Sequence, residues 1–120
     1  MIRFVPDENN SAATGAYGEG AVKYSVDGDQ SGAGVVFKVS GNDCFVFEIT
    51  GSIPVITEGL IRSALNYAAN RGAYTARITA AAQGDNGAVL SRLGFKDENG
   101  ALTADIPDVL TCACGCGCKN

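Results

Sequence analysis

Histidine and tryptophan are both absent from this sequence of 120 residues, and methionine occurs once. The lack of histidine excludes a Ser-His-Asp or Cys-His catalytic group, and a metal site would have to use thiolates and carboxylates. Basic residues are few as well, because nine scattered Lys and Arg stand against thirteen Asp and Glu. A nucleic-acid-binding protein normally collects its cations on one surface, so we expect no nucleic-acid partner.

Long hydrophobic runs are also lacking. No segment approaches the ~20 apolar residues of a membrane-spanning helix, and the opening MIRFVPDENN has no signal-peptide core. We therefore expect a cytoplasmic protein without a membrane partner, in a compartment where thiols stay reduced. Four of the five cysteines lie in the last nine residues. We expect residues 1–111 to form a single domain and residues 112–120 to form a cysteine-rich tail.

Alternating apolar and polar residues between Ala21 and Thr50 predict three antiparallel strands, in the segments AVKYSV, AGVVFKVS and CFVFEIT. The apolar segment from Ile2 to Val5 predicts a strand before them. The intervening PDENNSAATGAYGEG has many small residues and no period, which indicates a loop. Cys44 is expected to be buried among its apolar neighbours.

The clearest helix is predicted over residues 57–71, with Thr57 as its N-cap, Glu58 in its first turn and Gly72 at its C-terminal cap. Its apolar face consists of Leu60, Ile61, Ala64, Leu65 and Ala68.

Three more elements are predicted after this helix. Residues 73–81 alternate as a strand, a short helix is expected from Asp85 as N-cap to Gly94, and a last strand covers residues 101–104. The order β-β-β-β-α-β-α-β predicts an α+β fold with a central mixed sheet, mostly antiparallel, and two helices in the C-terminal half.

The run EGLIRSALNYAANRGAYTARITA, followed by LSRLGF, resembles the C-terminal half of the GCN5-related N-acetyltransferase (GNAT) family. The resemblance covers residues 43–95, and residues 21–42 share only the strand pattern. It implies a GNAT-like domain that uses acetyl-CoA as co-substrate. In the family, the pantetheine arm lies where two strands splay apart, here residues 43–50 and 73–81, and the diphosphate lies on backbone N–H groups in the loop of residues 52–59.

A helix start suits the diphosphate because its first amides are unpaired and the helix dipole is positive there. The acyl-CoA-binding residues that the resemblance implies are Ile49, Thr50, Ser52, Ile56, Thr57, Glu58, Gly59, Leu60, Asn86 and Leu90.

This loop departs from the family's signature. With Gly59 as its first glycine, the positions that usually hold Arg or Gln and Gly or Ala are occupied by Ile56 and Ile61. Glu58 adds a negative charge where a phosphate would bind. Arg62 either compensates this charge or forms an exposed i, i+4 ion pair with Glu58.

Catalytic side chains are sparse. The tyrosine that many members of the family use as general acid toward the departing thiolate is replaced by Leu90. Glu48 is the candidate general base, and the alternative is a solvent-facing strand residue. A free backbone N–H near Ile49 or Thr50 would stabilise the oxyanion without a side chain.

The acceptor implied by the resemblance is an amine on a small molecule or a peptide. Members of the family usually have one or two helices between the first two strands, and these helices form part of the acceptor wall. Here residues 6–20 are expected to be a loop instead. The acceptor pocket would therefore be open, or it would be completed by a second subunit in a homodimer.

The tail TCACGCGCKN places a cysteine at every second position: Cys112, Cys114, Cys116 and Cys118. In an extended chain these side chains would lie ~6.6 Å apart, whereas sulfurs on one zinc ion lie ~3.8 Å apart. The tail would therefore have to wrap at its glycines to hold a soft metal such as zinc or Cu(I). Redox chemistry and a tail without activity are the alternatives.

Three functions remain open at this point. The first is an acyl-CoA-dependent N-acetyltransferase acting on an unknown amine. The second is a GNAT-like binding module that has lost catalysis. The third is a metal- or thiol-handling protein that acts through the Cys112–Cys118 tail.

Overall fold

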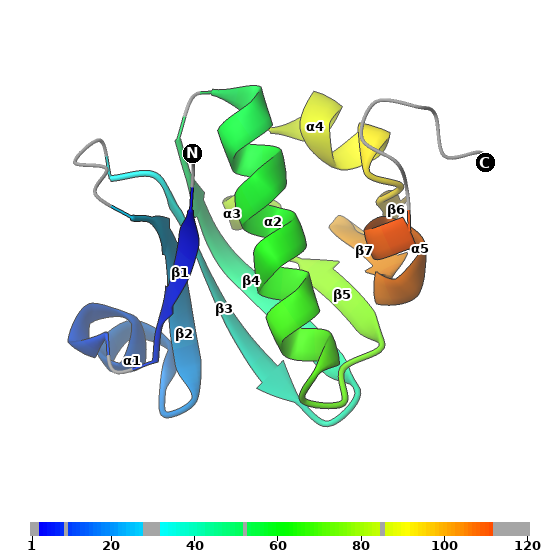
Figure 1. The fold of residues 1–120 in the computed structure, drawn as a ribbon. Coiled ribbons are helices and arrows are strands. Elements are labelled where there is room, and N and C mark those ends of the chain that lie inside the picture. The colour runs from blue at the N-terminus through cyan, green and yellow to red at the C-terminus, as the bar shows by residue number, and fades with distance from the viewer. Residues whose placement is uncertain (1–2, 9, 28–31, 52, 85, 112–120) are drawn as a thin grey trace.

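The computed structural model describes residues 3–8, 10–27, 32–51, 53–84 and 86–111 (Figure 1). A seven-stranded sheet in the order β1-β2-β3-β4-β5-β7-β6 runs through the molecule. Among the described strands, only β4 and β5 pair in parallel, so the predicted α+β fold with a mixed, mostly antiparallel sheet is confirmed. The elements are β1 Phe4–Asp7, α1 Ser11–Tyr17, β2 Ala21–Val26, β3 Gly34–Ser40, β4 Asp43–Thr50, α2 Pro54–Ala69, β5 Thr75–Ile78, α3 Ala80–Gln83, α4 Gly87–Arg92, β6 Lys96–Glu98, β7 Ala101–Asp105 and α5 Ile106–Thr111.

The helix α2 lies across one face of the sheet and forms the main core with it (Figure 1). Its predicted apolar residues are all fully buried, and they pack against Val35 and Phe37 of β3 and Cys44 and Val46 of β4. The buried position predicted for Cys44 is confirmed, and burial raises the pKa of its thiol to about 12. This thiol therefore stays protonated and unreactive at neutral pH.

The helix α2 begins three residues earlier than predicted. Pro54 occupies its first turn, where the missing N–H costs nothing and the fixed φ favours a helix. The N-cap is Ile53, and Thr57 is an interior helical residue with 1% exposure. The prediction of Thr57 as N-cap is therefore wrong, because proline set the helix start and overrode the capping preference of threonine.

The predicted loop between the first two strands is also wrong in part, because residues Ser11–Tyr17 form the helix α1. The Oδ1 atom of Asn10 caps it by accepting a hydrogen bond from the N–H of Ala13 at 2.9 Å. Ala13 packs against Ala21 and Val36 on the face of the sheet opposite α2. A single buried alanine gives too weak a periodic signal for the helix to stand out in sequence.

The C-terminal third contains more elements than predicted. The strand expected over residues 73–81 is shorter, Thr75–Ile78, because Thr79 caps the short helix α3. The helix α4 has Asn86 as its N-cap, and Asp85 lies outside the described residues. Strand β7 confirms the last predicted strand, whereas β6 and α5 were missed.

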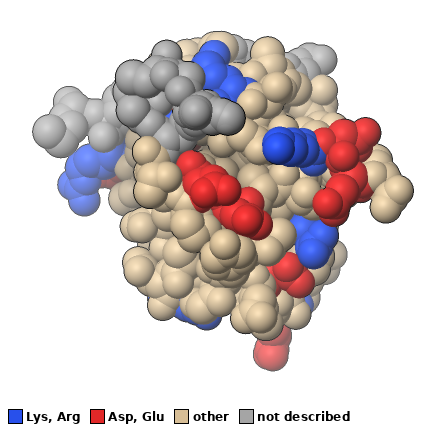
Figure 2. Space-filling model, turned by 90° about the vertical axis from the view of Figure 1, so that its right-hand side faces the viewer, with Lys and Arg blue, Asp and Glu red and all other residues tan. Residues whose placement is uncertain are grey.

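Charged residues are dispersed on the side of the molecule that faces right in Figure 1. Figure 2 shows Lys and Arg interspersed with Asp and Glu there, without a continuous basic patch on the part that the grey atoms leave visible. Within the described segments, no helix combines the length and the apolar character that crossing a membrane requires.

Candidate functional site

The parallel strands β4 and β5 pair over only part of their course. Their register joins Asp43–Val46 to Thr75–Ile78, and the N–H of Thr79 donates a further hydrogen bond to the carbonyl of Val46 at 3.3 Å. Beyond this point β4 continues to Thr50. Strand β5 ends, and the segment that follows it forms α3, which lies against β4 (Figure 1). Residues 47–50 of β4 therefore have no strand partner on this side within the described chain. We call this region the fork.

A β-bulge lies at the base of the fork. On β3, Val36 pairs with Glu48 and Phe37 pairs with Val46, so Phe47 has no partner of its own. An extra residue in a strand resets the alternation of its side chains. Both Phe47 and Glu48 consequently lie on the face of the sheet that α1 covers.

Tyr17, the last residue of α1, contacts both of these side chains. Its ring stacks on that of Phe47, with centroids 4.4 Å apart and an interplanar angle of 6°. Its hydroxyl donates a hydrogen bond of 2.5 Å to Oε2 of Glu48. This bond, together with desolvation, raises the pKa of Tyr17 above its usual value, so the phenol keeps its proton at neutral pH. We call these two residues the Tyr17–Glu48 pair.

The side chain of Glu48 is exposed, which agrees with the alternative of a solvent-facing strand residue. It nevertheless accepts a hydrogen bond from Tyr17. Among the residues that the structure describes, no Lys or Arg forms an ion pair with it. The strand register places Lys23, Lys38 and Arg77 on the same face of the sheet. Of these, Arg77 is already paired with Asp43 at 3.3 Å. Within the described residues, the carboxylate of Glu48 therefore has no cationic partner.

The start of α2, where the resemblance places the diphosphate, offers few free amides. Pro54 has no N–H, and the N–H groups of Ile56 and Thr57 both donate to the carbonyl of Ile53 at 3.0 Å. The surface here is apolar instead, because Ile53 and Val55 are 57% and 68% exposed. An anion at this position would gain from the helix dipole but would find little direct hydrogen bonding.

Glu58 lies inside the helix and takes part in a network of ion pairs. Its carboxylate contacts Arg62 at 3.4 Å and Arg92 of α4 at 2.8 Å, and the side chain is only 11% exposed. Arg62 also donates to the carbonyl of Val109 in α5 at 3.2 Å. The i, i+4 pair expected between Glu58 and Arg62 is present, but it is mostly covered and it connects three helices.

The other residues implied for acyl-CoA binding are spread between core and surface. Leu60 and Leu90 are fully buried, so neither side chain is available to a ligand without rearrangement. Ile49 packs against the core, and Gly59 faces the ring of Phe4, whose Cζ would lie 2.4 Å from an added Cβ. Thr50 is exposed, Ile56 and Asn86 are partly so, and Ser52 lies outside the described residues.

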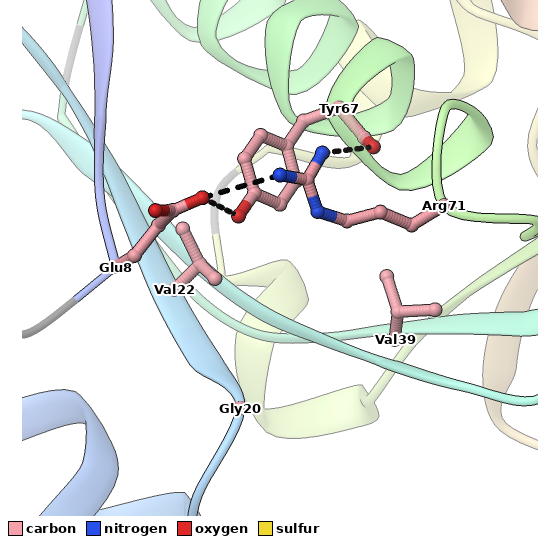
Figure 3. Close-up of a pocket in the computed structure, with 6 residues that line it drawn as sticks. All are labelled: Glu8, Gly20, Val22, Val39, Tyr67 and Arg71. Atoms are coloured by element: carbon pink, nitrogen blue, oxygen red, sulfur yellow. Dashed lines mark hydrogen bonds and ion pairs between the residues drawn. The ribbon is translucent and has the colours of Figure 1, made fainter.

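A second polar cluster lies on the α2 face (Figure 3). The hydroxyl of Tyr67 donates to Oε2 of Glu8, and Arg71 pairs with the same oxygen at 3.2 Å while its guanidinium lies 3.6 Å above the Tyr67 ring. These side chains border an open hollow of about 280 Å³ with Val22 and Val39 at its floor. The carboxylate of Glu8 thus accepts a hydrogen bond from the phenol of Tyr67 and is paired with the guanidinium of Arg71.

Metal ligands are not clustered in the described part of the chain, where no group of three or more Asp, Glu or Cys comes together. The tail cysteines Cys112, Cys114, Cys116 and Cys118 lie outside it, so the proposed soft-metal site stays a prediction. No protein-family model matches the chain, and a search of curated proteins finds no match either.

Sequence reasoning missed Tyr17, because the segment around it was expected to be a loop. A weak signal was present: Asn10 is a favoured capping residue, and Ala13 and Tyr17 follow at the four-residue spacing of one helix face.

Proposed function

We propose that this protein binds acyl-CoA at the fork and transfers the acyl group to an amine. The observation that carries this proposal is the short pairing of β4 with β5, which ends at Val46 and Ile78. Beyond these residues the edge of β4 is not occupied by a strand. The resemblance to the N-acetyltransferase family implies that these two strands splay apart; here β5 ends at Ile78, and α3 follows it against β4.

The edge of β4 beyond Val46, which lacks a strand partner in the described chain, would pair with the pantetheine arm of the carrier after α3 moves aside. An unpaired strand presents N–H and C=O groups that a second extended chain can pair with, and the arm is an extended chain that carries two amides. The diphosphate would contribute less, because the amides of Ile56 and Thr57 are already bonded to Ile53. We therefore expect acetyl-pantetheine to bind within about tenfold of acetyl-CoA, a difference of ~1.4 kcal/mol.

Transfer would proceed by direct attack of the amine on the thioester. The bulge at Phe47 places the carboxylate of Glu48 beside the fork, where it can accept a proton from the amine. Backbone N–H groups of β4 near Ile49 and Thr50 would stabilise the oxyanion.

The proposal is tested by thermal unfolding with increasing acetyl-CoA. Ligand at 100 times its dissociation constant should stabilise the protein by ~2.7 kcal/mol. Release of free CoA is then measured with ethylamine, benzylamine, spermidine and a lysine-containing peptide as acceptors. Absence of any thermal shift at millimolar acetyl-CoA would remove the proposal.

A binding module without turnover is the second candidate. It is favoured by the buried Leu90, which leaves no proton donor at the position where many family members have tyrosine. Binding of acetyl-CoA without release of CoA from any of the amines would support this candidate over the transferase.

A further inference from the structure

We propose that Tyr17 and Glu48 act together as the proton-transfer pair of the reaction, with Tyr17 supplying the acid that Leu90 cannot. This inference rests on the proposed acyl transfer at the fork. It assigns a role to a residue of α1 that the resemblance does not include.

The position of the Tyr17 hydroxyl is determined by several contacts. The Asn10 cap and the packing of Ala13 hold α1 on the sheet, the stacking on Phe47 orients the ring, and the bond to Glu48 orients the hydroxyl. Phe47 is the first residue beyond the last β4–β5 pair. The phenol is therefore held beside the point where the β4–β5 pairing ends.

The charge of Glu48 favours an amine as the second substrate. An alkylamine arrives mostly as ammonium at neutral pH, since its pKa resembles the ~10.4 of lysine. The carboxylate of Glu48, which has no ion pair with a described residue, attracts this cation more strongly than Glu8, which is already paired with Arg71. Lys23 and Lys38 share the face with Glu48 and weaken this attraction without pairing with it.

The proton balance closes within the pair. One proton leaves the ammonium for solvent before reaction, and the nitrogen of the neutral amine then attacks the thioester carbon. The C–N bond forms, the C–S bond breaks, and Glu48 takes the second proton from nitrogen. Tyr17 gives its proton to the departing thiolate, and the carboxylic acid of Glu48 returns a proton to the tyrosinate across their hydrogen bond of 2.5 Å. The products are the amide and the free thiol, and the pair is restored.

The test compares Tyr17→Phe, which keeps the ring stacked on Phe47, with Tyr67→Phe, which removes the other tyrosine–glutamate bond. Tyr17→Phe should lower kcat for CoA release about 100-fold, within the range of general acid catalysis, and leave the Kd of acetyl-CoA unchanged. The defect should shrink with phenyl thioacetate as acyl donor, because thiophenolate leaves without protonation. Tyr67→Phe should keep the wild-type kcat.

The outcomes separate the role of Tyr17 from the proposed acyl transfer at the fork. Equal kcat for wild type and Tyr17→Phe would overturn the role of Tyr17 and leave acyl transfer standing. A defect of equal size with phenyl thioacetate would also overturn it, because a structural role would slow both donors. Binding of acetyl-CoA without turnover in the wild type would overturn the pair but not the binding at the fork. Absence of binding would remove both.

Discussion

Two tyrosine–glutamate hydrogen bonds lie on opposite faces of the sheet, and they differ in what surrounds the carboxylate. On the α2 face, Tyr67 donates to Glu8, and Arg71 neutralises the charge. On the α1 face, Tyr17 donates to Glu48, which has no ion pair with any residue the structure describes. The bond between Tyr67 and Glu8 joins the end of β1 to α2, and the carboxylate there has a cationic partner. The bond between Tyr17 and Glu48 leaves a negative charge available beside the fork.

The largest expected effect separates these two glutamates. Glu48→Gln should reduce CoA release about 100-fold, because the amide cannot accept the amine's proton. Its stability should change by less than ~0.5 kcal/mol, since the side chain is exposed. Glu8→Gln serves as the matched control and should keep wild-type turnover. If both variants slow the reaction equally under steady-state assay, the distinction between the two faces does not hold.

The next effect concerns Glu58, the most buried acidic side chain among the ion pairs. Glu58→Gln should lower the free energy of unfolding by about 2 kcal/mol, because two arginines lose a charged hydrogen-bond partner. Arg92→Gln, at a side chain that is 46% exposed, should cost less than ~1 kcal/mol. Urea denaturation measures both. A smaller loss for Glu58→Gln than for Arg92→Gln would contradict a structural role for this carboxylate.

Gly59 provides a comparison within the helices. An added Cβ would lie 2.4 Å from the ring of Phe4, so Gly59→Ala should displace β1 and cost about 1–2 kcal/mol by urea denaturation. Gly15 of α1 has nothing within 4 Å of the corresponding position. Gly15→Ala should therefore stabilise the protein by ~0.5–1 kcal/mol through helix propensity alone. Stabilisation by both substitutions would show that the Phe4 ring moves away freely.

Alkaline titration tests the hydrogen bond of Tyr67 without any substrate. Desolvation and the bond to Glu8 raise the pKa of Tyr67 to about 12. Because the folded-state pKa lies above the unfolded value of ~10, the stabilisation from this group is present below pH ~10 and is lost as pH rises toward 12. Ultraviolet titration of Tyr67→Phe should lack the last tyrosinate step. Its persistence would assign that step to another tyrosine.

The smallest effect is expected from deletion of residues 112–118. This deletion should leave the melting temperature and acetyl-CoA binding unchanged, because the fork and the core that the structure describes are built from residues before Thr111. Elemental analysis of the full chain and the deleted chain for zinc, copper and iron tests the soft-metal proposal. Equal metal content in the two would remove it.

The sequence predicted strands β2, β3 and β4 and the main helix well, because each has a clear apolar period, whereas it missed β6. Leu60, Ile61 and Leu65 are buried as their spacing indicated, and Cys44 lies in the core. The helices α1, α3 and α5 were missed, since none exceeds seven residues and each buries at most two side chains. For helices this short, stability comes from packing on the sheet and leaves little trace in composition.

The candidate site was predicted in part. Glu48 was named from the sequence, whereas its hydrogen-bond partner Tyr17 is 31 residues away in a segment that was expected to be a loop. The amides expected for the diphosphate proved to be bonded to Ile53, because Pro54 moved the helix start upstream.

Local patterns in the chain were sufficient for the class of fold, the course of the central strands and the buried face of α2, because alternation and helical spacing follow from neighbouring residues. The bulge at Phe47 and the end of β4–β5 pairing at Val46 were not readable in this way. They depend on how β3 and α3 meet β4, which are contacts between segments far apart in the chain. The same long-range packing places one tyrosine–glutamate bond beside an arginine, and it gives the other no ion pair with any residue that the structure describes.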